Sequence, residues 1–86
     1  MGKERQLYKD IKRLAYKLEK FINNDTIKQL KLNDKELDII TTTRLLYSTN
    51  KEMQQDELCK YMFDLTTKAL KKMERQVQQF IQELKA

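Results

Sequence analysis

The chain offers few side chains that could carry out covalent chemistry. Its single cysteine, Cys59, has no histidine anywhere in the sequence to activate it or to share a metal ion with it, and histidine is the usual companion in both roles. Paired acids such as Asp56 and Glu57 are adjacent, so on a helix they would point in different directions. We therefore expect no enzymatic activity, no cofactor, no metal site and no small-molecule substrate, and we expect Cys59 to be a small buried or half-buried hydrophobe.

Another stretch carries hydroxyl groups and cations that could contact nucleic-acid phosphates. If Leu65 to Arg75 is a helix placed in a DNA major groove, its DNA-binding side chains are Thr66, Thr67, Lys68, Lys71, Lys72 and Arg75. Lysine and threonine position a protein on the DNA backbone, but they discriminate poorly between bases. No asparagine, glutamine or arginine lies early in this stretch for a bidentate contact with a base. Sequence-specific recognition is therefore weakly supported.

The net charge of +5 is concentrated at the two ends of the chain, whereas the middle is acidic. This distribution suits contact of the ends with phosphate. It suits equally a contact between an end and the middle, within one chain or in a dimer. Nucleic acid is therefore one candidate partner, and a second protein chain is another.

The length and composition predict one small helical domain, residues 1–86. Proline is absent and the only glycine is Gly2, so the interior lacks the residues that mark tight turns. We expect an all-α bundle with a long basic N-terminal helix, a buried central helix and a long C-terminal helix. No apolar run approaches the roughly 18 residues that a membrane span needs, and no signal peptide precedes the first helix. We therefore expect a cytoplasmic protein.

Apolar residues recur at helical spacing near the N-terminus. The stripe consists of Leu7, Ile11, Leu14, Leu18 and Phe21, at steps of three and four residues. The other faces of this helix are mostly basic, so a helix lying on a membrane surface is an alternative. Three acidic residues interrupt the basic face, which favours a bundle helix with its back in water. These acids are Glu4, Asp10 and Glu19.

A short helical segment is expected after the first helix. The sequence Asn-Asn-Asp ends that helix, and Asp25 can serve as the N-cap of a segment from Thr26 to Leu32. From this segment, Ile27 and Leu30 would face the core.

The central helix begins at a capping signal. Asn33 with Glu36 three residues later has the form of a capping box, although Asp34 could serve as the cap instead. The helix that follows, about Asp34 to Ser48, is apolar around nearly its whole circumference. We expect such a helix to be buried on several sides.

Two interpretations stay open for the segment that follows, which either residue of the Thr-Asn pair at 49–50 would cap. In the first, one helix runs to the C-terminus, because apolar residues from Leu58 to Leu84 keep steps of three or four. In the second, Gln54 to Met62 is the first helix of a helix-turn-helix, and Phe63 and Asp64 form the turn. The phosphate-contacting stretch described above would then be the recognition helix.

Most of the chain resembles a known family. The sequence "LYKDIKRLAYKLEKFINNDTIKQLKLNDKELDIITTTRLLYSTNKEMQQDELCKYM", Leu7 to Met62, is similar to the N-terminal half of MarR-family winged-helix transcriptional regulators. The family's order is kept: a long first helix, a link ending in "LKLNDKEL", a buried helix ending in "LL", and "MQQDELCKYM", which resembles the family's "t-x-x-E-L-A-x-x-L". The resemblance covers roughly two-thirds of the chain. It implies a small regulatory protein of helix-turn-helix type that acts in transcription control.

The rest of the chain departs from that family. After the "E-L-A" element the family has a turn, a recognition helix and a β-wing that closes on a glycine, whereas this chain continues with "FDLTTKALKKMERQ" and offers no glycine, strand or basic hairpin. The sequence "LTTKALKKMERQVQQFIQEL" resembles the family's dimerisation helix, introduced by "L-T-x-x-G", as much as its recognition helix. The resemblance thus leaves two modes of action: binding DNA, or pairing with a DNA-binding protein as a decoy or antirepressor.

Pairing in a homodimer or heterodimer would use both ends of the chain. The expected contact residues are Leu7, Ile11, Leu14, Leu18, Phe21, Val77, Phe80, Ile81 and Leu84. An alternative from another class is a stand-alone helical inhibitor that binds a protein target. The short, basic and glycine-poor chain is similar in character to bacteriocin-immunity proteins.

Overall fold

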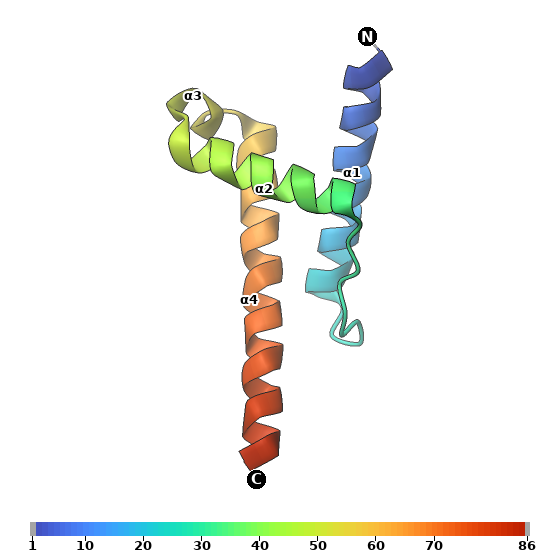
Figure 1. The fold of residues 1–86 in the computed structure, drawn as a ribbon, viewed down its shortest axis with the longest axis vertical. Coiled ribbons are helices and arrows are strands. Elements are labelled where there is room, and N and C mark those ends of the chain that lie inside the picture. Colours follow the sequence, from blue (N-terminus) through green and yellow to red (C-terminus); the bar gives the residue numbers. More distant parts are fainter. Residues whose placement is uncertain (1, 86) are drawn as a thin grey trace.

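The computed structural model describes residues 2–85, which form a small all-α bundle, as the sequence predicts (Figure 1). The helices are α1 (Gly2–Asn23), α2 (Asp34–Thr49), α3 (Lys51–Gln54) and α4 (Glu57–Lys85). Within this described range there is no β-strand. Among the helices of residues 2–85, none is both long enough and apolar enough to cross a membrane.

The two long helices lie side by side and run in the same direction, and α2 crosses them (Figure 1). The molecule measures 54 × 26 × 21 Å along its principal axes. It is elongated because the last part of α4 extends beyond the end of α1 and beyond the link to α2 (Figure 1). The 29 residues of α4 correspond to a rod of about 44 Å at the usual helical rise.

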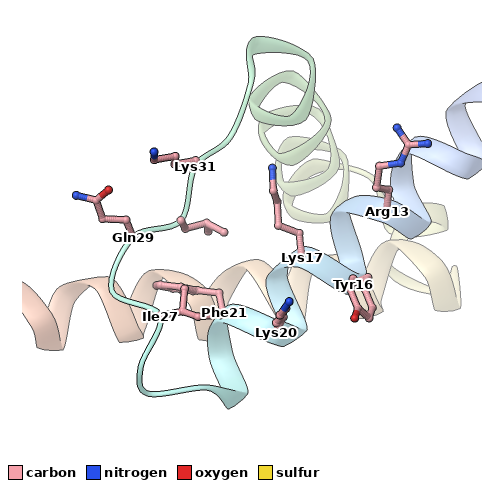
Figure 2. A pocket seen from close by; sticks show the side chains of 9 residues that line it. Arg13, Tyr16, Lys17, Lys20, Phe21, Ile27, Gln29 and Lys31 are labelled. Carbon is pink, nitrogen blue, oxygen red and sulfur yellow. The ribbon is translucent and has the colours of Figure 1, made fainter.

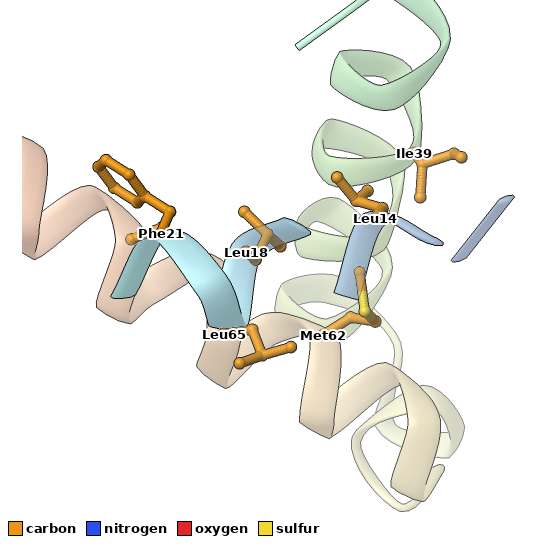
Figure 3. Packing of buried hydrophobic residues seen from close by; sticks show 7 residues of the cluster. Leu14, Leu18, Phe21, Ile39, Met62 and Leu65 are labelled. Carbon is orange, nitrogen blue, oxygen red and sulfur yellow. The ribbon is translucent and has the colours of Figure 1, made fainter. Parts of the chain in front are cut away.

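The hydrophobic core is small and lies where α1, α2 and the first half of α4 meet (Figure 3). Its buried members are Leu14, Leu18, Phe21, Ile39, Met62, Leu65 and Ala69. The members from α1 and α4 follow steps of three or four residues, which place them on one side of each helix. From Ile11 to Phe21 the predicted N-terminal stripe therefore faces the core, whereas Leu7 lies outside it.

The link between α1 and α2 is not helical, so the predicted segment from Thr26 to Leu32 was wrong. Asn24, rather than Asp25, organises the turn: its side-chain oxygen accepts hydrogen bonds from the backbone N–H and the hydroxyl of Thr26, at 3.0 and 2.6 Å. The carbonyl oxygen of Ile27, which a helix would use internally, accepts instead from the Lys72 side chain of α4. The link thus docks on α4 through a turn followed by a stretch without regular secondary structure.

The helix α2 begins at the predicted capping box. The Asn33 side chain accepts from the Glu36 backbone N–H at 2.7 Å, and the Glu36 carboxylate accepts from the Asn33 backbone N–H at 3.0 Å. The expectation that α2 is buried on several sides was wrong, since Leu37 is 46% and Leu45 63% exposed. Because α2 crosses the pair of long helices as a single outer layer, it buries only the side that carries Glu36 and Ile39.

The start of α4 differs from both interpretations of the sequence. Asn50 caps the short α3, and Asp56 then caps α4 by accepting from the Cys59 backbone N–H at 2.8 Å. From Glu57 onward α4 continues without interruption through Phe63 and Asp64. The interpretation of one long helix is confirmed for this part, and the predicted turn at Phe63 and Asp64 was wrong.

Candidate functional site

The predicted phosphate-contacting side chains do not form one exposed surface. Lys68, Lys71 and Arg75 are exposed, whereas Thr67 is half-buried. The other two members of the set, Thr66 and Lys72, are buried, with 2% and 5% of their surface accessible. The expectation that these two are exposed was wrong because each faces another element of the same chain.

Thr66 and Thr67 face the arginine of α2. Arg44 donates from Nη1 to the two hydroxyl oxygens, at 2.7 and 2.9 Å, and to the carbonyl oxygen of Phe63 at 3.3 Å. The Arg44 guanidinium also lies 4.3 Å from the centre of the Phe63 ring, and Tyr47 stacks on that ring with a centroid separation of 4.3 Å. These contacts hold α2 against α4 at the point where a turn was predicted.

Lys72 faces the end of α1. Its ammonium group donates to three carbonyl oxygens, those of Phe21, Asn24 and Ile27. Helix ends leave carbonyl oxygens without partners inside the helix, and a lysine near the C-terminus of a helix satisfies them and complements the helix dipole. Lys72 is therefore a structural cation that joins α1, the link and α4.

Neither Arg44 nor Lys72 was identified from the sequence as a structural residue. Arg44 did leave a signal, because it is the only cation between Lys35 and Lys51 and lies in the most apolar helix. Lys72 left none, since its neighbours Lys68 and Lys71 have the same residue type and the same helical context.

Two acidic side chains connect α1 with α2. Lys17 donates to the Glu36 carboxylate at 3.0 Å, and the Lys35 ammonium lies 2.6 Å from Asp10 Oδ2. Burial raises the pKa of Glu36, but the Asn33 backbone N–H and Lys17 outweigh it, so the pKa lies below the ordinary value. The contact with Lys35 likewise lowers the pKa of Asp10. Both carboxylates thus hold the bundle together in their ionised form.

The predicted pairing residues fall into two groups. Leu14, Leu18 and Phe21 are at most 1% exposed, so the expectation that they contact a partner was wrong: they are already covered by this chain. Leu7 is half exposed and, with Ile11, lines an apolar cavity of about 290 Å³ that also contains Cys59.

The second group lies on the part of α4 that extends beyond the core. Val77, Phe80, Ile81 and Leu84 are 55%, 59%, 39% and 71% exposed. Together with half-buried Met73, three of them continue the core stripe of α4 at steps of four, three and four residues. We call Met73, Val77, Phe80 and Leu84 the distal stripe. The distal stripe is the apolar face of the second half of α4, which extends past the elements that cover the first half of this helix.

Cys59 is buried, as predicted. Its thiol contacts the carbonyl oxygen of Thr43 at 3.7 Å, and burial, followed by the nearby Asp56, raises the pKa of the thiol. A raised pKa disfavours the reactive thiolate. Among residues 2–85 there is no group of three side chains that could hold a metal ion.

A basic groove lies between α1 and the link (Figure 2). Its volume is about 470 Å³, and it is lined by Phe21, Ile27 and Leu30 together with four cations, Arg13, Lys17, Lys20 and Lys31. Tyr16 borders it on α1 and is 68% exposed. Lys17 is the cation of this group that is paired with Glu36.

Comparison with known proteins adds no assignment to these surfaces: no family model, curated protein or solved structure matches this chain.

Proposed function

We propose that this chain is a small regulatory protein that acts by pairing with another helical chain through the distal stripe. The observation that carries the proposal is the exposure of Val77, Phe80 and Leu84 on a helix that extends beyond its own core. A contiguous apolar face of this kind is costly to leave in water and is typical of an interaction surface. The role in transcription control, as a decoy or antirepressor, rests on the resemblance of Leu7 to Met62 to MarR-family regulators.

The spacing of the distal stripe supports pairing with a second copy in antiparallel orientation. If Val77 faces Phe80 of the partner, then Met73 faces the partner's Leu84, and the twofold symmetry of a homodimer repeats both pairs. Four layers of apolar contact result, spaced as in a short coiled coil. The end of the partner helix would then lie beside the depression formed by Leu30 and the distal stripe.

Charge also favours the antiparallel arrangement. The chain carries a net charge of +5, and a parallel pair would place two positively charged bodies next to each other. An antiparallel pair separates the two bodies and aligns the helix dipoles favourably. The same stripe is suited to a heterologous helix, which is how a decoy would engage the dimerisation helix of a full-length regulator.

Direct DNA reading is less well supported than pairing. That alternative depended on a turn and on six contacts. Because α4 is continuous, the turn is absent from it. Because Thr66 and Lys72 are buried, two of the six contacts are lost. Lys68, Lys71 and Arg75 alone could contact phosphate, without base specificity.

The size of the protein in solution tests the proposal. Light scattering coupled to gel filtration should give a dimer for the native chain and a monomer for Phe80→Asp, because a charge at the centre of the apolar layers is not compensated. Gln82→Asp adds the same charge to an exposed polar position of α4 and should leave the dimer intact. A native chain that is strictly monomeric, and that binds no MarR-family regulator of the same genome in a two-hybrid assay, would rule the proposal out.

A further inference from the structure

The outer face of α1 carries a row of cations. Five basic residues and one aromatic residue on this face are exposed: Arg5, Lys9, Lys12, Arg13, Tyr16 and Lys20. They recur at the spacing that places residues on one side of a helix. From Arg5 to Lys20 the row is about 23 Å long at the helical rise.

The two acidic side chains that interrupt this row in the sequence are both engaged by other helices. In the sequence, Asp10 and Glu19 interrupt the basic residues. In the structure, Asp10 lies against Lys35 of α2, and Glu19 accepts a hydrogen bond from the hydroxyl of Tyr61 on α4. Asp10 therefore lies off the row, where Lys35 and, to a smaller extent, Arg13 lower its pKa. Glu19 is half-buried and borders a depression with Tyr16 and Lys20, so its charge opposes the cations only at the C-terminal end of the row.

At its C-terminal end the row joins the basic groove (Figure 2). The apolar part of the groove is formed by Phe21, Ile27 and Leu30, and none of its nine lining residues is acidic. Arg13, Lys20 and Lys31 surround this apolar part. The combination of an apolar floor, a cationic rim and an exposed tyrosine is what a nucleotide requires: a surface for the flat base and donors for the phosphate.

We propose that this row and groove bind single-stranded nucleic acid without sequence preference. Phosphates of the strand lie along the cations from Lys9 to Lys20, and a base stacks on Tyr16 or enters the groove beside Lys31. Single strands fit better than duplexes because their bases are unpaired and can stack on aromatic side chains. The proposal goes beyond pairing through the distal stripe and does not depend on it.

An anionic membrane is the competing partner for such a row, and the structure favours it less. A helix that lies on a membrane inserts its apolar face among the lipids. In α1 that face carries Leu14, Leu18 and Phe21, which are buried in the core. Only electrostatic attraction would then hold the protein on the lipid surface.

Fluorescence anisotropy of a labelled oligothymidylate of about 15 nucleotides, titrated with the intact protein at about 50 and 200 mM salt, tests the proposal. We expect binding that weakens with salt. The triple variant R13Q/K20Q/K31Q should bind at least about tenfold more weakly, and its log–log salt slope should be smaller by about 2, because single strands contribute about 0.7 for each phosphate contact. Tyr16→Ala should weaken binding at least about fivefold, whereas Tyr16→Phe should not, because stacking needs only the ring.

The matched control is K51Q/K60Q/K85Q, which removes the same charge from exposed positions of α3 and α4 that lie outside the row, the groove and the predicted DNA contacts. If this variant loses as much affinity as the groove triple, the binding reflects net charge alone and the site is rejected. The same holds if the native protein does not bind the oligonucleotide at low salt, or if it binds a duplex of equal length as tightly and independently of Tyr16. Stronger association with phosphatidylglycerol vesicles than with the oligonucleotide would reassign the face to a membrane surface. Circular dichroism checks that each variant is folded. The single variant Lys20→Glu is a second, milder test and should also weaken binding of the oligonucleotide.

Discussion

The ammonium group of Lys72 lies 4.1 Å from the centre of the Phe21 ring, inside the bundle. Phe21 is 1% and Lys72 5% exposed, so a charged residue lies against one of the largest core side chains. The ring face attracts the cation, and the carbonyl oxygens of Phe21, Asn24 and Ile27 accept its hydrogen bonds. This one side chain joins the end of α1 and the link to α4.

Replacing Lys72 by methionine should destabilise the bundle strongly. The substitution keeps an unbranched apolar stem but removes the donor shared by the Phe21, Asn24 and Ile27 carbonyl oxygens, of which the bond to Phe21 is buried. This loss costs about 2 to 3 kcal/mol. Urea unfolding followed by circular dichroism measures the loss. Lys71→Met is the matched control, since Lys71 is exposed on the same helix, and it should change the free energy of unfolding by no more than about 0.5 kcal/mol. Equal unfolding midpoints for the two variants would contradict the structural role of Lys72.

Arg44 should contribute through its planar guanidinium as well as through its charge. Arg44→Met removes the donors to Thr66, Thr67 and the Phe63 carbonyl and should cost about 1 to 3 kcal/mol. Arg44→Lys keeps the charge but not the planar group that both donates and stacks on Phe63, so it should recover only part of that loss. In thermal unfolding, the midpoint temperature should be highest for the native chain, lower for Arg44→Lys and lowest for Arg44→Met. A lysine variant as stable as the native chain would show that charge alone matters.

The stability of the bundle should fall in acid. The pKa of Glu36 is lowered in the folded state from an ordinary value of 4.5, with burial opposing the Asn33 and Lys17 contacts that prevail. A lowered folded pKa means that the stabilisation is present above the unfolded pKa and is lost as the pH falls through the folded one. The urea concentration at the unfolding midpoint should therefore be constant near neutral pH and should decrease as the pH falls below the ordinary pKa of glutamate. In Glu36→Gln the midpoint at neutral pH should be lower and the acid decrease smaller; an identical pH profile would contradict the role of this carboxylate.

The sequence predicted what depends on short-range pattern. The steps of the apolar residues identified the core side of α1 and favoured a continuous helix from Leu58 to Leu84, and the Asn33–Glu36 pair identified the start of α2. Both signals depend on residues within one or two helical turns of each other. The burial of Cys59 was also predicted from the sequence, because without a histidine the cysteine has no partner for catalysis or metal binding.

The errors in the prediction come from contacts between residues far apart in the chain. Thr66 and Lys72 look like exposed phosphate ligands by residue type, and only the positions of Arg44 and of the end of α1, 22 and 51 residues away, show otherwise. The burial of α2 was overestimated for a related reason. Apolar residues around a helix show how much of its surface could be buried, but a small bundle has too few other helices to bury all of it. The basic groove was missed because its cations come from α1 and from the link, which only the fold brings together.

Disulfide trapping should reveal the orientation of the proposed pair. In a Cys59→Ala background, proteins carrying Val77→Cys and Phe80→Cys are mixed and oxidised, with one of them enlarged by a fusion tag. Antiparallel packing places residue 77 opposite residue 80 of the partner, within the Cα separation of roughly 4.4 to 6.8 Å that a disulfide spans, so the mixed species should dominate. Parallel packing would instead join like positions, so untagged Val77→Cys alone would cross-link efficiently. Trapping of like positions would overturn the antiparallel arrangement while leaving pairing intact, whereas the absence of any cross-link beyond that of a Gln82→Cys control would count against pairing itself.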